Sequence, residues 1–130
     1  MNSRTNFIVI LCYFLLTGLT SAENVTLTVD GQNLNYTSIV DIAGWQFNHN
    51  GCATDANGGD SASNGFTISC SNSMCLAFSF AGSVISEGSG TLVNLGGECS
   101  IHSLSEFVLS GLGGTSLNFT YNNISGGGEE

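Results

Sequence analysis

The stretch Val25-Thr26-Leu27-Thr28-Val29 decides the fold, because apolar and hydroxyl-bearing residues alternate strictly along it. A period of two places alternate side chains on opposite faces of a β-strand, so one face of this segment is apolar and the other polar. The same period recurs in short runs bounded by Gly, Asn or Ser. These runs are Leu34 and Tyr36; Ala43, Trp45 and Phe47; Phe66 and Ile68; Leu76, Phe78 and Phe80; residues 92–95; Phe107 and Leu109; and Leu117, Phe119 and Tyr121.

The number and spacing of these runs predict the fold class. Proline is absent from the 130 residues, and no segment shows a sustained helical period. Short strands of this number in about 100 residues predict an all-β fold, a two-sheet antiparallel β-sandwich of 7–9 strands. We expect one sandwich domain over residues 23–124, with a long Gly-, Asn- and Asp-rich loop at residues 48–64. Residues 125–130, a Gly and Glu segment, are predicted to form a flexible tail.

The first 22 residues have the organisation of a signal peptide. Arg4 supplies a positive charge, residues 7–16 are all apolar, and Thr20-Ser21-Ala22 provides small residues for cleavage. The apolar run would span roughly 15 Å as a helix, about half of a bilayer core. We therefore expect a secreted protein that begins at Glu23 and is not inserted in a membrane. An uncleaved membrane anchor is the alternative.

The charge of the mature chain excludes several kinds of ligand. Arg4 is the only Lys or Arg, and all ten Asp and Glu residues follow residue 22, so the mature chain carries a net charge of −10 with neutral histidines. Binding to nucleic acid requires cations that neutralise phosphates. We therefore exclude nucleic acid as a partner, and anionic membranes and sulfated glycans are disfavoured for the same reason.

Four cysteines remain after the leader with Cys12 is removed. An even number of cysteines in a short secreted chain is typical of disulfides, and four permit three connectivities. We favour Cys70–Cys75 across a short turn and Cys52–Cys99 between two distant loops. A zinc site is the alternative, but no C-x-x-C spacing is present.

The short disulfide conflicts with the apolar pattern around it. If Cys70 lies opposite Cys75, then Ile68 lies opposite Ala77, and the series Leu76, Phe78 and Phe80 faces the other side of the sheet. Two arrangements would reconcile the patterns: a β-bulge near the turn, or a hairpin buried on both faces.

Four N-x-[ST] sequons begin at Asn24, Asn35, Asn118 and Asn123. The first three fall on the polar phase of their predicted strands. A glycan cannot be attached to a side chain that points into a core, so the strand assignment and the sequons agree. We predict N-glycosylation at these positions.

The sequence contains one weak candidate for a metal site. Asp55, Asn57 and Asp60 could offer three oxygen ligands to Ca²⁺. The spacing differs from that of an EF-hand, and no Glu closes the loop. A Gly-rich turn with side-chain-to-backbone hydrogen bonds is the favoured alternative, and we expect no cofactor.

Catalysis is not expected. The two histidines, His49 and His102, belong to neither a G-x-S-x-G nor an H-E-x-x-H motif, and His49 is predicted at a loop edge. Trp45, the only tryptophan, has two interpretations. Its phase with Phe47 favours a core residue, whereas an exposed position would make it a platform for stacking a sugar ring.

Several segments resemble cohesin-like modules of secreted proteins from aquatic microbes. They are Asn35-Tyr36-Thr37-Ser38, Asp41-Ile42-Ala43-Gly44-Trp45-Gln46-Phe47, Asn64-Gly65-Phe66-Thr67, Leu76-Ala77-Phe78-Ser79-Phe80 and Ser89-Gly90-Thr91-Leu92-Val93. The resemblance covers roughly residues 25–121. It implies a jelly-roll-like sandwich related to cohesins and carbohydrate-binding modules, usually without catalytic activity.

Together these features predict a non-enzymatic, extracellular structural or interaction module. Its sheet edges could accept a strand from a protein partner or from a second copy, and residues 23–29 could be donated to the next copy in a fibre. The alternative is a carbohydrate-binding module with a glycan ligand.

Overall fold

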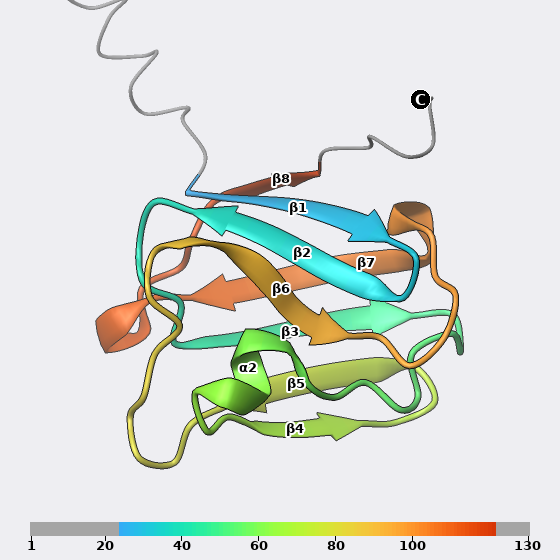
Figure 1. Cartoon of the computed structure of the whole chain (residues 1–130), viewed down its shortest axis with the longest axis horizontal. Coiled ribbons are helices and arrows are strands. Elements are labelled where there is room, and N and C mark those ends of the chain that lie inside the picture. Colours follow the sequence, from blue (N-terminus) through green and yellow to red (C-terminus); the bar gives the residue numbers. More distant parts are fainter. Residues whose placement is uncertain (1–23, 122–130) are drawn as a thin grey trace, which may run out of the picture.

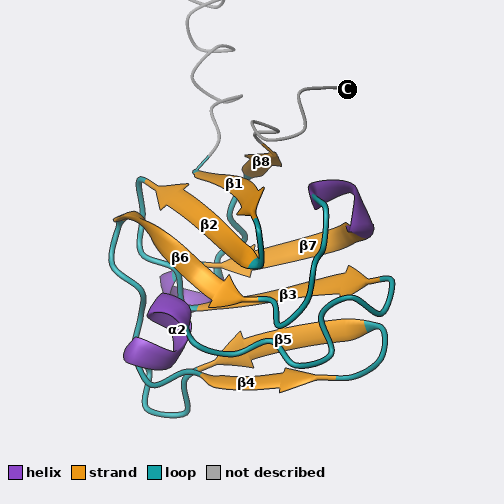
Figure 2. Ribbon diagram, turned by 45° about the vertical axis from the view of Figure 1, so that its right-hand side comes forward, coloured by secondary structure: helices purple, strands orange, loops and turns teal. Residues whose placement is uncertain are grey.

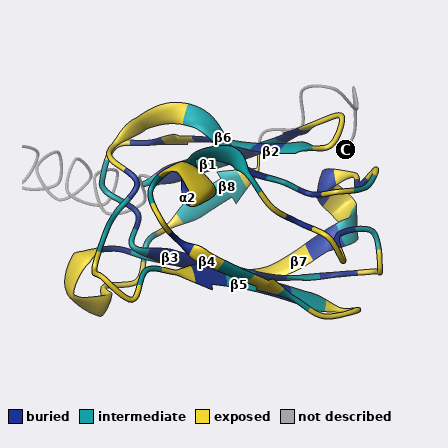
Figure 3. Cartoon of the chain, turned by 60° about the horizontal axis from the view of Figure 1, so that its bottom comes forward, coloured by how far each residue is buried: buried dark blue, intermediate teal, exposed yellow. Residues whose placement is uncertain are grey.

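The computed structural model describes residues 24–121, which form an all-β, two-sheet sandwich (Figure 1). The predicted leader, Asn123 and the predicted tail lie outside these residues. Two sheets of four strands each are stacked as layers (Figure 3). The described strands are β1 (Val25–Asp30), β2 (Asn33–Ser38), β3 (Gly44–His49), β4 (Thr67–Cys70), β5 (Met74–Phe78), β6 (Gly88–Asn94), β7 (Leu104–Ser110) and β8 (Phe119–Tyr121).

The strand order distinguishes the two sheets. The first, here the β1 sheet, has the order β6-β2-β1-β8, and the second, the β3 sheet, has the order β4-β5-β3-β7. All neighbouring strands are antiparallel except β1 and β8, which run parallel. This exception arises because the chain leaves β7 in one sheet, passes the 3-10 turn η2 (Leu112–Gly114), and enters the other sheet at the end where β1 begins.

The core lies between the inner faces of the sheets. The alternation predicted for β1 is confirmed, since Val25, Leu27 and Val29 are buried and Thr26 and Thr28 are not. The facing sheet contributes the largest buried rings. Other core residues are Leu34, Tyr36, Trp45, Phe47, Cys75, Ala77, Leu92, Val93, Leu95, Leu104, Phe107 and Leu109.

Two irregularities place extra apolar residues in the core. The register of β3 with β7 shifts between Gln46 and Asn48, and Glu106 adopts a positive φ of 52° at this point. Leu104 and Phe107 consequently both face inward although they are three residues apart. A similar shift in the pairing of β2 with β6 leaves Leu92 and Val93 adjacent and both buried.

The segment predicted as a long loop contains a short helix, α2 (Gly59–Ser63), which contacts β6 in one sheet and β4 in the other (Figure 2). Gly59 has a φ of +67°, and a Cβ there would lie 2.7 Å from the carbonyl oxygen of Leu92. Only glycine therefore permits this close approach of α2 to β6. A period-based analysis misses α2 because it is little more than one turn long.

Both predicted disulfides are present. Cys52–Cys99 joins the loop after β3 to the loop between β6 and the 3-10 turn η1 (Ile101–Ser103), with a Cα–Cα distance of 5.5 Å. Cys70–Cys75 links directly opposite residues of β4 and β5, with a Cα–Cα distance of 4.1 Å. Among residues 24–121 no helix has the length and apolar character needed to cross a bilayer.

Candidate functional site

The outer face of the β1 sheet is polar, and its side chains hydrogen-bond to one another across the strands. Between β2 and β6 the Oγ1 of Thr37 lies 3.1 Å from the Oγ of Ser89, and the Thr91 hydroxyl donates to Oδ1 of Asn35 at 2.8 Å. Thr26 and Thr28 continue this surface on β1. The face thus satisfies much of its own hydrogen-bonding capacity.

The three described sequons all belong to this sheet. Asn35 lies on β2, Asn24 immediately precedes β1, and Asn118 immediately precedes β8. Asn24 accepts a hydrogen bond from the backbone N–H of Asn118 through Oδ1 (2.9 Å), just as Asn35 accepts one from Thr91. An N-linked glycan is attached through Nδ2 and leaves Oδ1 available as an acceptor, so these bonds are compatible with glycosylation. Glycosylation itself stays a prediction.

The outer face of the β3 sheet is different, because apolar side chains project from it. Leu76 and Phe78 on β5 lie on the same face as Val108 on β7, and Phe78 and Val108 are exposed. Gly44 lies between Phe78 and Ser110 in the register, and its missing side chain leaves a depression of about 180 Å³. The residues that line the depression, here called the docking face, are Gly44, Trp45, Gln46, Leu76, Ala77, Phe78, Val108 and Ser110.

The docking face explains why the short disulfide and the apolar pattern of β5 conflict in the sequence. Cys70 pairs with Cys75 and Ile68 with Ala77 through a regular ladder without a bulge. The apolar series on β5 therefore points outward, with Phe78 38 % exposed, and Phe80 beyond the strand is 82 % exposed. Neither predicted reconciliation occurs: the hairpin has no bulge, and its outer face is not covered by another element of residues 24–121. Sequence reasoning noticed the conflict but missed the exposed face.

Trp45 is a core residue, and the sugar-platform prediction is wrong. Its side chain is only 3 % exposed and stacks on Phe47, with ring centroids 5.4 Å apart. The indole N–H donates to the Ser61 hydroxyl (2.8 Å), which donates to the carbonyl oxygen of Leu92 (2.7 Å). A ring enclosed in this way offers no face to a sugar; it connects β3, α2 and β6 instead.

The two histidines have separate positions. His49 is buried at the end of β3, where Nδ1 accepts hydrogen bonds from the N–H of Gly51 (2.9 Å) and Ala53 (3.4 Å). Nε2 lies 3.1 Å from the carbonyl oxygen of Ser71, so it carries the proton in this tautomer. His49 thus holds the loop that leads to Cys52. His102 lies on the exposed side of η1.

The three candidate calcium ligands take part in different interactions. Asp60 accepts a hydrogen bond from the Tyr36 hydroxyl at 2.6 Å, and the amide nitrogen of Asn57 donates to the carbonyl oxygen of Asp55 at 2.7 Å. Burial, followed by the bond to Asp60, raises the pKa of Tyr36 above its ordinary value of 10.0. Residues 24–121 contain no group of three His, Cys, Asp or Glu side chains placed to hold a metal ion.

Comparison with protein families, curated proteins and solved structures finds no match to this chain. The resemblance to cohesin-like modules therefore stays a prediction.

Proposed function

We propose that this protein is a non-enzymatic extracellular interaction module that binds a protein partner through the outer face of the β3 sheet. The observation that carries this proposal is the contrast between the two outer faces. All three described sequons belong to the β1 sheet, whereas the β3 sheet presents exposed Phe78 and Val108 beside a depression.

The composition of the docking face suits a protein partner. Contiguous apolar surface on a soluble domain marks interaction sites, and the centres of interfaces are depleted of charged residues. β4 and β5 contain no charged residue, although the mature chain carries a net charge of −10. The exposed aromatic ring of Phe78 is of the kind that anchors interfaces.

Assembly by donation of the N-terminal strand finds no support in the geometry. β1 pairs with β2 on one side and with β8 on the other, so it is an interior strand of its own sheet. Its removal would expose Val25, Leu27 and Val29 of the core. Self-association, if it occurs, would instead use the docking face or the edge strands.

Carbohydrate binding is the weaker candidate. Trp45 is buried, and the exposed rings of Phe78 and Phe80 lie at 68° to each other, so they do not form a flat platform. The experiment below distinguishes binding of a glycan from binding of a protein.

The test places a glycan on the docking face. Gln46→Asn together with Asn48→Thr creates a sequon at the centre of this face, where Gln46 lines the depression. The matched control, Ser89→Asn, completes a sequon with Gly90 and Thr91 on the outer face of the β1 sheet. Both variants and the parent protein are expressed in secreting eukaryotic cells, and intact mass establishes that the new sites are occupied.

The immobilised proteins are then exposed to the extracellular proteins of the source organism. We expect one or more proteins to be retained by the parent and by Ser89→Asn, and lost from the variant with the glycan at position 46. Equal retention by both variants would contradict the proposal. Retention of glycans instead of proteins, lost on Phe78→Ser, would favour the carbohydrate-binding alternative.

A further inference from the structure

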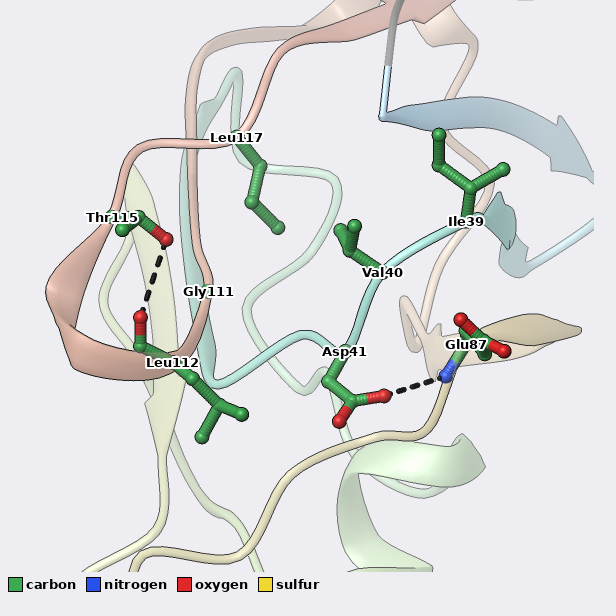
Figure 4. Close-up of a pocket in the computed structure, with 8 residues that line it drawn as sticks. All are labelled: Ile39, Val40, Asp41, Glu87, Gly111, Leu112, Thr115 and Leu117. Carbon is green, nitrogen blue, oxygen red and sulfur yellow. Dashed lines mark hydrogen bonds between the residues drawn. The ribbon is translucent and has the colours of Figure 1, made fainter.

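A second concave site lies at the end of the sandwich where β2 and β7 end and β3 and β6 begin (Figure 4). It is a pocket of about 310 Å³ between the connection from β2 to β3, the residue preceding β6, and the connection from β7 to β8. This volume is within the range of about 300–1,000 Å³ that is usual for ligand pockets. No residue of this pocket also lines the depression of the docking face.

The pocket has polar and apolar walls, and its apolar part is formed by Ile39, Val40, Leu112 and Leu117. Val40 and Leu117 point into the space between them in Figure 4, and Ile39 and Leu112 stand at its margins with exposed fractions of 64 % and 60 %. Gly111 permits Leu117 and Thr115 to approach the backbone closely, because a Cβ there would lie 3.0 Å from Cδ2 of Leu117 and 2.7 Å from the Thr115 hydroxyl. Two of the six large apolar residues that residues 24–121 expose therefore flank one cavity.

Two acidic residues, Asp41 and Glu87, lie together at one side of this space. Oδ1 of Asp41 accepts a hydrogen bond from the backbone N–H of Glu87 at 3.0 Å, which holds the two residues together. The side chain of Glu87 is exposed at the same rim (Figure 4). Neither carboxylate has a lysine or arginine to pair with, because the only such residue of the sequence is Arg4 in the predicted leader.

We infer that this pocket binds a lysine or arginine side chain of a protein partner. The long aliphatic part of such a side chain suits the walls formed by Val40, Leu112 and Leu117, while its cation reaches Asp41 and Glu87. The charge is complementary, because the only Lys or Arg of the sequence is Arg4 in the predicted leader, and a cationic side chain for this pocket would come from another protein. The inference does not depend on the docking face.

The experiment measures binding of capped amino acids by NMR. The ¹⁵N-labelled protein is titrated with Nα-acetyl-arginine amide, Nα-acetyl-lysine amide and, as a neutral analogue, Nα-acetyl-norleucine amide. The amide of Glu87 reports directly because it donates to Asp41, and the amides of Gly111 and Leu112 report from the opposite wall. We expect saturable shifts at these amides with the two cationic compounds and none with norleucine amide.

Substitutions identify the carboxylates as the cause. Asp41→Asn with Glu87→Gln removes both charges and keeps an oxygen acceptor for the Glu87 N–H, and it should weaken binding about tenfold or more. Glu98→Gln with Glu106→Gln removes the same charge elsewhere and should change the affinity less than about twofold. Absence of saturable shifts, equal binding of norleucine amide, or unchanged binding by the Asp41 and Glu87 variant would each overturn the inference. Binding lost equally in both variants would show an effect of net charge alone and would also overturn it.

Discussion

The two sheets of this protein have equivalent inner faces and opposite outer faces. On the β1 sheet, alternation gives a polar exterior of Thr and Asn with three described sequons; on the β3 sheet, the same alternation gives an exterior with Leu76, Phe78 and Val108. In both sheets the period of two produces the core. Packing of the core does not require the outward residues of either sheet to be apolar. A contiguous apolar outer face is therefore typical of a surface that contacts another molecule.

The sheets are joined by a small set of side chains at one side of the sandwich. Trp45 of the β3 sheet bonds to Ser61 of α2, which bonds to Leu92 of the β1 sheet, and Tyr36 of the β1 sheet bonds to Asp60 of α2. These hydrogen bonds connect the two sheets through α2.

The largest expected effect distinguishes inward from outward aromatic residues on the β3 sheet. Trp45→Ala should lower the free energy of unfolding by about 3–5 kcal/mol, because it leaves a cavity in the core. Phe78→Ser should lower it by about 1 kcal/mol, since this side chain is 38 % exposed and its main ring contact is with Phe80. Urea denaturation of both variants measures the difference. A comparable loss for Phe78→Ser would mean that this face supports the fold and would weaken the assignment of a docking face.

Removal of each disulfide measures how much the stability of the sandwich depends on a covalent link between the sheets. Replacing Cys52 and Cys99 by Ala should destabilise the protein by about 4 kcal/mol in the chain-entropy model, because this bond closes a long loop between the sheets. Replacing Cys70 and Cys75 by Ala should cost about 2 kcal/mol, because that loop is short and lies within one sheet.

Thermal and urea unfolding of the two double variants measure which disulfide contributes more to stability. If the short disulfide proved the more important of the two, the exposed hairpin of β4 and β5 would itself depend on the crosslink for its register.

The smallest expected effect is a pH dependence of the free energy of unfolding, caused by the hydrogen bond between Tyr36 of β2 and Asp60 of α2. Burial and the hydrogen bond to Asp60 raise the pKa of Tyr36 above its ordinary value of 10.0. The folded protein therefore holds this proton more tightly than the unfolded chain. The stabilisation is complete below pH 10 and is lost as the pH rises above it, with a slope of up to about 1.4 kcal/mol per pH unit.

Urea denaturation between pH 8 and pH 11 measures this slope, and Tyr36→Phe should remove most of it. Tyr121→Phe is the control: burial and the nearby Glu106 also raise the pKa of Tyr121, but this side chain is 43 % exposed and takes no part in the bond between Tyr36 and Asp60. A slope that survives Tyr36→Phe would contradict the role of the Tyr36–Asp60 bond.

Much of the fold was predictable, because strand periodicity and cysteine number are local properties. Val25, Leu27 and Val29 identify their inward phase without any partner, and the outward phase of Asn24, Asn35 and Asn118 follows from the same alternation. Both disulfides were predicted and are confirmed. The parallel pairing of β1 with β8 and the short helix α2 were not predicted, because each depends on contacts between distant segments.

The sequence by itself determined that alternating residues form strands, that four cysteines can pair, and that Lys and Arg are absent after Arg4. Only the tertiary structure decided which face of β5 is covered. Leu76 and Phe78 are as apolar as Leu27 and Val29, yet the register set by Cys70 and Cys75 turns the first pair away from the opposite sheet. Likewise, Asp41 and Glu87 are 46 residues apart and meet beside one pocket only because three connections converge there. Burial is a property of two packed surfaces, so the alternation within β5 alone does not show which of its faces meets the opposite sheet.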